Sequence, residues 1–264
     1  MDQRRHKLTQ KLSKKAKRQE HILKALELDP AMRVNDLARR LDVSQETVRR
    51  DLSELDDSGR IKRTYGGAVR ATRFEPHLAE RLQLHIKERE RIAQKAVELL
   101  GDHESLFVGG GSTTFHFARA LKSADRRLTV LTPSFGIATE LASNAKIEVL
   151  FLPGQVEPRE GLVHGPETLE YIGRYRTPLA VVGATAVDEE GVSEALLSSA
   201  RVYQAMIQSA DRTLVLADSS KMGGRSLRVV LKWNPNVDLL TDSQPSDSIR
   251  QAAEDAGTQI LVAP

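Results

Sequence analysis

The sequence predicts an α/β protein in two parts: an N-terminal winged helix-turn-helix, and a larger C-terminal domain built on a mostly parallel sheet. Short helical patterns with capping residues fill the chain before residue 60, and apolar runs alternate with amphipathic segments after residue 105. The charge is also divided. Residues 1–75 hold 19 Lys and Arg against 12 Asp and Glu, a net of +7, whereas the remainder carries −4. This asymmetry predicts a polyanionic partner for the N-terminal part.

The composition narrows the class of protein. The 264 residues, 40% of them hydrophobic, suit two domains with real cores. The absence of cysteine excludes disulfides and thiolate metal sites and fits a reducing compartment. No apolar segment follows the basic N-terminus as in a signal peptide, and the longest apolar stretch, residues 179–187, is too short to cross a bilayer. We therefore expect a cytoplasmic protein with no membrane, metal or cofactor partner.

Three helices are predicted in the N-terminal part. The first covers residues 14–28 and ends at Asp29-Pro30, because proline lacks an amide donor. The second covers residues 34–41 with Asn35 as its N-cap. The third begins after the N-cap Ser44 and ends at Gly59. We expect a basic arm over residues 1–17, the winged helix-turn-helix over 18–73, and the α/β domain over 74–264.

The third helix has two distinct faces. Val48, Leu52 and Leu55 recur at helical spacing and should pack inward. The opposite face presents polar side chains, and recognition helices contact DNA with such a face and with their first turn. The predicted DNA contacts on this helix are Ser44, Gln45, Thr47, Arg49 and Arg50. Asp51, beside Arg50, could orient an arginine rather than repel DNA.

A wing is expected to follow. Ile61, Arg63 and Tyr65 alternate as in a strand, Gly66-Gly67 suits a tight turn, and Lys62 and Arg63 could bind phosphates. Two alternatives remain open from these residues alone: the three helices could be a scaffold that docks another protein, and the basic arm could be a solvated tail.

The C-terminal part predicts a parallel sheet covered on both faces. A long amphipathic helix over residues 80–100 is expected first. The predicted strands cover 105–108, 128–132, 147–152, 179–183, 213–217, 237–240 and 258–262. The predicted helices between them cover 113–122, 134–144, 166–174, 199–210 and 245–256. Ligands of such folds bind beyond the carboxyl ends of the strands.

Those strand ends supply the predicted effector site. The loop that follows the first strand is rich in glycine and hydroxyl groups and opens a helix, so it favours an anion cradle over a plain strand–helix turn. It consists of Gly109, Gly110, Gly111, Ser112, Thr113 and Thr114. Lys221, in a second loop, could reach the same anion. Carboxylates suited to polyol hydroxyls lie in two further loops. These loops contribute Arg159, Glu160 and Gly165, from residues 153–165, and Glu194.

The helix-turn-helix segment resembles the DeoR family of bacterial repressors. The match consists of Val43-Ser44, Thr47-Val48-Arg49-Arg50-Asp51-Leu52, Leu55, Gly59, Arg63 and Gly66-Gly67. The resemblance extends over the sensor part, with Gly111-Ser112-Thr113, Asp218 to Lys221, and Thr241-Asp242. It implies a sensor domain similar to ribose-5-phosphate isomerases. The stretch from Pro153 to Arg176, with Glu194, looks most like the glycerol-3-phosphate regulon repressor branch.

The chain departs from that family pattern at several positions. Gly109 stands where the family has aspartate, Pro133 where it has asparagine, and Arg89 where lysine is common. Pro153-Gly154 replaces a glycine pair, and the helix after Glu194 carries Ser199, Tyr203 and Gln204 in place of an acid and a basic pair. These departures affect the prediction of which effector binds, whereas the residues expected to bind its phosphate match the family.

The resemblance implies a non-enzymatic repressor of a carbohydrate or polyol operon. It would bind double-stranded operator DNA as a homodimer or homotetramer, and a phosphorylated sugar or polyol would release it. The alternatives are a sugar-phosphate isomerase with a DNA-binding appendage and an architectural DNA protein. The isomerase is disfavoured because Glu194 and Lys221 are its only candidate acid–base groups. An architectural protein would have no need of a ligand-binding domain.

Overall fold

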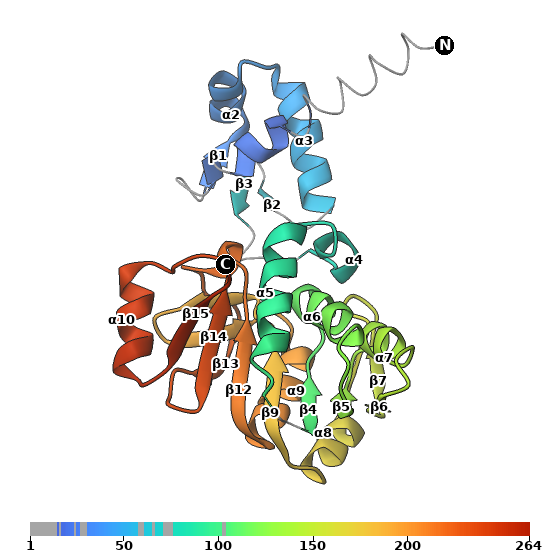
Figure 1. Ribbon diagram of the computed structural model, residues 1–264. Coiled ribbons are helices and arrows are strands. Elements are labelled where there is room, and N and C mark those ends of the chain that lie inside the picture. The colour runs from blue at the N-terminus through green and yellow to red at the C-terminus, as the bar shows by residue number, and fades with distance from the viewer. Residues whose placement is uncertain are drawn as a thin grey trace, which may run out of the picture. The chain divides into compact units, whose positions relative to one another are not determined.

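The computed structural model divides into two units, residues 1–76 and 77–264 (Figure 1). It describes residues 15, 17–23, 25–26, 31–57, 61–64, 67–70, 76–101 and 104–264. The predicted basic arm therefore lies outside the described residues except for Lys15 and Lys17.

The first unit joins helices to a small antiparallel sheet. Residues 17–23 are helical and are followed by β1 (Ala31–Arg33), α2 (Val34–Leu41), α3 (Gln45–Asp57), β2 (Ile61–Thr64) and β3 (Gly67–Arg70). The strands pair in the order β1-β3-β2. Ile22, Leu37, Val48 and Leu52 are completely buried in one core. The predicted second and third helices and the inward face of the third are confirmed.

Local details differ from the sequence-based predictions. Asn35 is not the N-cap of α2, because β1 leads directly into the helix and places Arg33 at that position. β1 itself was not predicted, since three residues give no periodicity. The wing turn is also shifted: Thr64 pairs with Gly67, so Gly67 belongs to β3 rather than to the turn. Gly59 lies outside the described residues.

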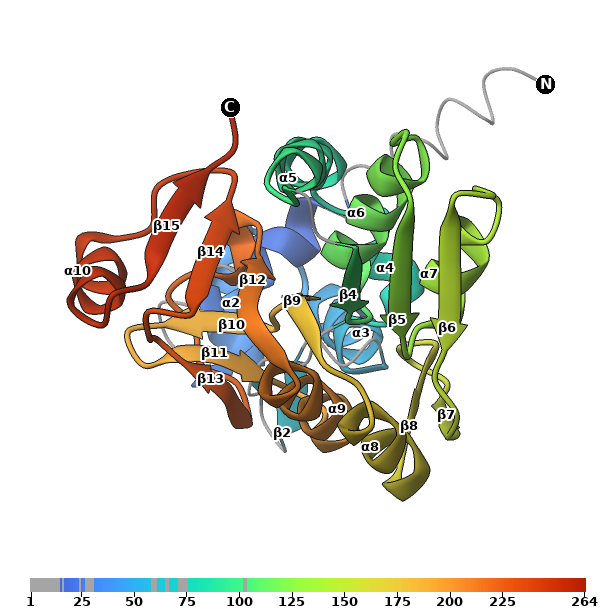
Figure 2. The ribbon, with the colours of Figure 1, turned by 60° about the horizontal axis from the view of Figure 1, so that its bottom comes forward.

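The second unit contains a seven-stranded sheet in which every neighbouring pair is parallel, in the order β15-β14-β12-β9-β4-β5-β6 (Figure 2). The strands are β4 (Ser105–Val108), β5 (Leu128–Thr132), β6 (Ile147–Phe151), β9 (Thr177–Val182), β12 (Ala210–Leu216), β14 (Val237–Thr241) and β15 (Gln259–Val262). These strands confirm the predicted parallel sheet.

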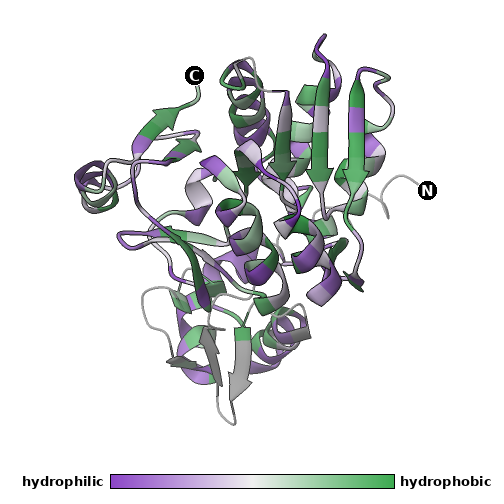
Figure 3. Cartoon of the chain, turned by 90° about the horizontal axis from the view of Figure 1, so that it is seen from below, coloured by the Kyte–Doolittle hydropathy of each residue, from purple (hydrophilic) through white to green (hydrophobic). Residues whose placement is uncertain are grey.

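Helices cover both faces of this sheet. One face packs against α5 (Ile86–Glu98), α6 (Ser112–Lys122) and α7 (Phe135–Leu141), and the other against α8 (Pro166–Gly173), α9 (Leu197–Gln208) and α10 (Asp247–Asp255). Successive strand residues alternate between the two cores, so Leu106 and Val108 face α6 while Phe107 faces α9. The strands accordingly read as mostly hydrophobic along their length (Figure 3).

Three predictions for this unit were wrong. The single helix expected over 80–100 is two, α4 (Leu78–Arg81) and α5, separated by His85 in a left-handed conformation with φ of 52°. Residues 153–165 are not a loop, because β7 (Gln155–Glu157) and β8 (Leu162–His164) form a hairpin there. Glu194 ends a strand of a second antiparallel sheet, formed by β10 (Ala186–Asp188), β11 (Gly191–Glu194) and β13 (Arg228–Lys232).

Candidate functional site

Ser44 caps the helix predicted to read DNA. Its Oγ accepts a hydrogen bond of 3.2 Å from the Thr47 amide, and the two hydroxyls lie 2.9 Å apart. This satisfies one of the amides that a helix start leaves unpaired, which stabilises a helix by about 1 kcal/mol. The predicted N-cap is therefore confirmed, and the first turn of α3 is held in a defined geometry.

The polar face of α3 is accessible. Gln45, Arg49 and Arg50 are exposed, and Thr47 is half-buried. The contact of 3.7 Å between Arg50 and Glu46 joins two highly exposed side chains, so it is weak and leaves Arg50 available. Lys62 and Arg63 lie on β2, but their side chains are outside the described residues.

Asp51 orients an arginine, as expected, and that arginine is Arg18. Its buried carboxylate accepts hydrogen bonds from Nε and Nη2 of Arg18, the second at 3.0 Å. Lys15 donates to Glu54 one turn further along α3 at 2.7 Å. Arg18 and Lys15, although part of the basic N-terminal run, thus fasten the first helix to α3.

The predicted effector site lies at the carboxyl edge of the parallel sheet. Because β4, β9 and β12 are neighbours in the sheet, the residues that follow them, Gly109, Gly183 and Asp218, reach the same edge. A Cβ placed on Gly183 would lie 3.8 Å from the Gly110 carbonyl oxygen, which shows how closely two of these strand ends approach.

The loop after β4 combines a strained glycine with a helix start. Gly111 precedes α6 with φ of +118°, a conformation that side-chain-bearing residues rarely adopt. Thr114 Oγ1 donates to the Gly111 carbonyl at 3.1 Å and fixes the loop. Ser112, Thr113 and Thr114 are buried, and Gly111 is half-buried. The first amides of an eleven-residue helix are thus presented beside Gly111, an arrangement suited to an anion.

Gly109 and Gly110 have a packing role. A Cβ on Gly109 would lie 3.1 Å from Cε1 of Tyr203, and one on Gly110 would lie 3.1 Å from Cδ2 of Leu162. Tyr203 also donates from its hydroxyl to the Gly110 carbonyl at 3.0 Å. The first two glycines of the run therefore make room for side chains from the opposite face of the sheet.

Lys221 is half-buried on a short turn beside a buried ion pair. Asp218 caps this turn by accepting from the Ser220 amide at 3.1 Å, and its other oxygen accepts from Arg89 Nε at 2.8 Å. Burial by itself opposes ionisation of Asp218, but the charge of Arg89 and the hydrogen bonds from Ser220 and Arg89 outweigh it and hold the pKa of this carboxyl below its ordinary value.

Glu160 is held by a second buried arginine. Both of its oxygens accept from the guanidinium of Arg81, at 2.8 and 2.7 Å, and both side chains are almost fully buried. Arg89 in turn donates from Nη1 to the Arg81 carbonyl. A buried polar chain thus runs from Asp218 through Arg89 and Arg81 to Glu160. Arg89 was visible in the sequence as a departure from the family, whereas nothing in the sequence marked Arg81.

The remaining predicted residues are placed around this edge. Glu194 is buried and accepts from the Thr185 hydroxyl and from the Ala195 amide. Gly165 precedes α8 with φ of +113°, and Arg159 is exposed on the hairpin turn. Among the described residues no cluster of three histidine, aspartate or glutamate side chains could hold a metal ion. Nor does any described helix have the length and apolar character needed to cross a membrane.

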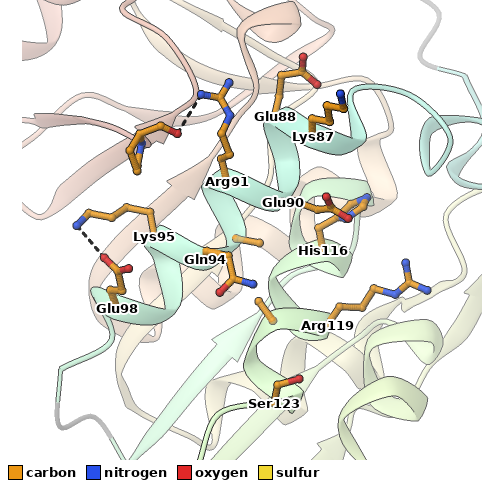
Figure 4. A pocket seen from close by; sticks show the side chains of 13 residues that line it. Lys87, Glu88, Glu90, Arg91, Gln94, Lys95, Glu98, His116, Arg119 and Ser123 are labelled. Carbon is orange, nitrogen blue, oxygen red and sulfur yellow. Dashed lines mark hydrogen bonds and ion pairs between the residues drawn. The ribbon is translucent and has the colours of Figure 1, made fainter.

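A groove of about 790 Å³ lies elsewhere, between α5 and α6 (Figure 4). Its walls carry both signs of charge, including Lys87, Glu90 and Arg119, and none of the predicted effector residues lines it. His116 lies on its wall, and burial together with the charge of Arg89 lowers the pKa of this imidazole. The strand ends remain the stronger candidate for the effector because only they combine a glycine loop, a helix start and a lysine.

The two units define the class of protein: a DNA-binding module joined to an α/β ligand-sensing domain, the construction of a ligand-responsive transcriptional regulator. A family model described as "DeoR-like helix-turn-helix domain" matches residues 18–74, and one described as "DeoR C terminal sensor domain" matches residues 84–243. The chain belongs to the DeoR family, and it is a transcriptional regulator rather than an enzyme.

Characterised relatives span nearly the whole chain. The HTH-type transcriptional repressor GlcR of Bacillus subtilis (strain 168) is 30% identical over 224 residues, covering 84% of this chain and 86% of the relative. The glycerol-3-phosphate regulon repressor of Escherichia coli (strain K12) is 27% identical over 250 residues, covering 94% and 98%. Among solved structures, ribose 5 phosphate isomerase A from Neisseria gonorrhoeae aligns with a TM-score of 0.39 and 20% identity over 52% of this chain and 54% of that one.

Proposed function

We propose that this protein represses a carbohydrate or polyol catabolic operon in the cytoplasm and that a phosphorylated sugar or polyol releases it from its operator. The observation that carries the proposal is the Gly111–Thr114 loop, which opens α6 at the carboxyl edge of the sheet, the edge at which the turn with Lys221 also follows its strand. The printed names of relatives, among them a glycerol-3-phosphate regulon repressor, support a short polyol phosphate as the effector.

In this proposal Arg49 and Arg50 read base edges, and Ser44, Gln45 and Thr47 contact DNA near the helix start. Lys62 and Arg63 bind phosphates from the wing. The exposed polar face of α3 supports the first part. A homodimer or homotetramer would place two such helices on a pseudo-palindromic operator.

In the sensor, Ser112, Thr113, Thr114 and the amides after Gly111 hold the phosphate with help from Lys221. Arg159, Glu194 and Gly165 contribute further contacts to the effector. Phosphate and carboxylate groups both accept paired hydrogen bonds from a guanidinium. The effector's phosphate can therefore replace Glu160 as the partner of Arg81, and the released Glu160 carboxylate then binds the effector as well.

The effector claim is tested by measuring operator binding at fixed salt while phosphorylated polyols and sugars of three to six carbons are titrated. At least one compound should weaken operator binding and raise the melting temperature, since a ligand of the folded state stabilises it. The matching non-phosphorylated compounds are the control. A panel that changes neither quantity would overturn the sensor claim.

Two variants distinguish contacts to DNA bases from contacts to DNA phosphates. Arg49→Ala should lose about 1–3 kcal/mol of discrimination between operator and random DNA, the scale of one bidentate base contact. Lys62→Ala should weaken both DNAs alike and reduce the salt dependence by about one counterion. Equal losses on operator and random DNA from both variants would contradict these roles.

A further inference from the structure

The outer face of α5 carries a row of exposed polar side chains that line the groove described above (Figure 4). Lys87 lies in the first turn of the helix, and Glu98 ends it. Arg91 and Gln94 lie between them at the spacing that keeps side chains on one side of a helix. The opposite side of α5 is buried in the core of the domain. The row is therefore the solvent side of the helix.

The two ends of this row are charged in the order that an isolated helix disfavours. A helix start is electropositive and a helix end is electronegative, yet α5 has Lys87 at its start and Glu98 at its end. The two residues lie about three turns apart, or about 16 Å along the axis, so they cannot pair within one chain. Among the described residues Lys87 has no ion-pair partner, and Glu98 pairs only with Lys95, at 2.9 Å.

We propose that two copies of this chain associate through α5, with the two helices packed antiparallel about a twofold axis. An axis beside positions 92 and 93 sets Lys87 of each copy opposite Glu98 of the other, because a twofold contact is made twice. Each acidic helix end then lies at the electropositive start of the other helix. The inference rests on the proposed function and names the partner that a repressor with two half-sites requires.

The neighbouring residues agree with the same axis. Arg91 of each copy faces Gln94 of the other, which is uncharged. Glu88 and Lys95 lie on one flank of the row and are half-buried. In the antiparallel pair, Glu88 of each copy comes within one helical turn of Lys95 of the other. A row of such mixed charge has little attraction for DNA or for an acidic surface, whereas it complements a reversed copy of itself.

Exposed apolar side chains at the two ends of α5 support this pairing. Ile86 begins the helix and Leu99 follows it, and their exposed fractions are 39% and 37%. The axis that pairs Lys87 with Glu98 also brings Ile86 of one copy to the end at which Leu99 of the other lies. Association would therefore remove apolar surface from water at both ends of the helix pair, which favours it.

Charge reversal tests the pairing. Lys87→Glu and Glu98→Lys each turn two attractions between the copies into two repulsions. Exposed ion pairs are individually weak, so each variant should associate about tenfold more weakly than the wild-type protein. Association of the full chain is measured by sedimentation velocity over a range of protein concentrations. Thermal melting followed by circular dichroism checks that both variants are folded.

An equimolar mixture of the two variants gives the decisive measurement. In a dimer of one Lys87→Glu chain and one Glu98→Lys chain, opposite charges face each other again at both ends. The mixture should therefore associate nearly as tightly as the wild-type protein, although neither variant does so alone. The chain that carries both changes should recover association as well. Arg201→Glu is the matched control, because it reverses an exposed charge on α9, at the other face of the sheet.

Binding to an operator with two half-sites is the second readout. Each variant alone should bind this operator more weakly than the wild-type protein, and the mixture should regain the affinity. Wild-type association in both single variants, or a mixture that associates no better than its components, overturns the inference. A wild-type protein that stays monomeric also overturns it. A protein that pairs through α5 but responds to no phosphorylated compound overturns the proposed function and leaves the pairing supported.

Discussion

Arg89 and Asp218 show how strongly single residues depend on each other here. Both side chains are within 2% of complete burial, so each charge is stabilised by its partner and not by water. Removing one partner of such a pair is far more damaging than replacing both with apolar groups, because the other charge stays buried and unpaired. The pair also lies directly behind the loop that carries Lys221, so its integrity shapes the proposed effector site.

Arg89→Met should therefore lower the free energy of unfolding by about 3–5 kcal/mol. Urea denaturation measures this loss, and Arg91→Met, on the exposed side of α5, is the control. Because the pKa of Asp218 is lowered in the folded state, its share of the stability is present above the ordinary aspartate value of about 3.9 and is lost as pH falls below it. An Arg89→Met protein as stable as the control would contradict this account.

His116 carries a different pH dependence. It is 4% exposed, and burial lowers its pKa with help from Arg89 and Arg119, while Glu90 acts in the opposite sense. Near pH 6.5 the imidazole of His116 is therefore protonated to a larger extent in the unfolded chain than in the folded chain. Stability should be complete above about pH 6.5 and decline as pH falls from there toward the lowered pKa. His116→Leu should flatten this part of the stability curve in urea titrations at pH 7.5, 6.5 and 5.5. An unchanged slope would show that His116 is not its source.

At the scale of elements, the parallel strands and the wing strand β2 were predictable, and most of the other antiparallel strands were not. Strands such as β9 and β12 are buried on both faces and therefore appear as continuous apolar runs. β1, β7 and β10 have three residues each, which is too few to show a period. The break between α4 and α5 was hidden because His85, not glycine, adopts the left-handed turn.

The candidate site was predictable only where its residues belong to short motifs beside well-defined strands and helices. Its glycine loop, Lys221 and the face of α3 follow from short motifs next to strong elements. The ion-pair partners of the buried carboxylates could not be predicted, because these residues are far apart in the sequence and meet only in the folded chain. The pairs are Arg18 with Asp51, Arg89 with Asp218, and Arg81 with Glu160. Exposed arginines and buried ones look alike in a sequence.

At the scale of the whole molecule, the polar chain from Asp218 to Glu160 passes through α4, the first helix of the second unit. The Leu78 amide also donates to the Arg159 carbonyl at 3.1 Å, so the start of the sensor is tied to the hairpin turn twice. Effector binding that redirected Arg81 would change how α4 is held. Occupancy of the effector site would thus reach the first helix of the second unit.

Replacing both Arg81 and Glu160 with methionine should keep the fold, because an apolar pair of similar volume is often tolerated in place of a buried ion pair. The effector-induced change in operator affinity, typically about 5–150-fold for coupled sites, should fall toward onefold. Operator affinity without effector and effector affinity without DNA are measured beside it. Retention of the full effector-induced change would exclude this route.

The contact between Tyr203 and Gly109 has an evolutionary consequence. A side chain at position 109 and a large ring at position 203 crowd each other, since a Cβ built on Gly109 would lie 3.1 Å from the ring. The two positions should therefore vary together during descent, with a bulky residue at one accompanied by a small residue at the other. A lineage that placed a larger residue at position 109 would therefore be expected to reduce the size of the residue at position 203 as well.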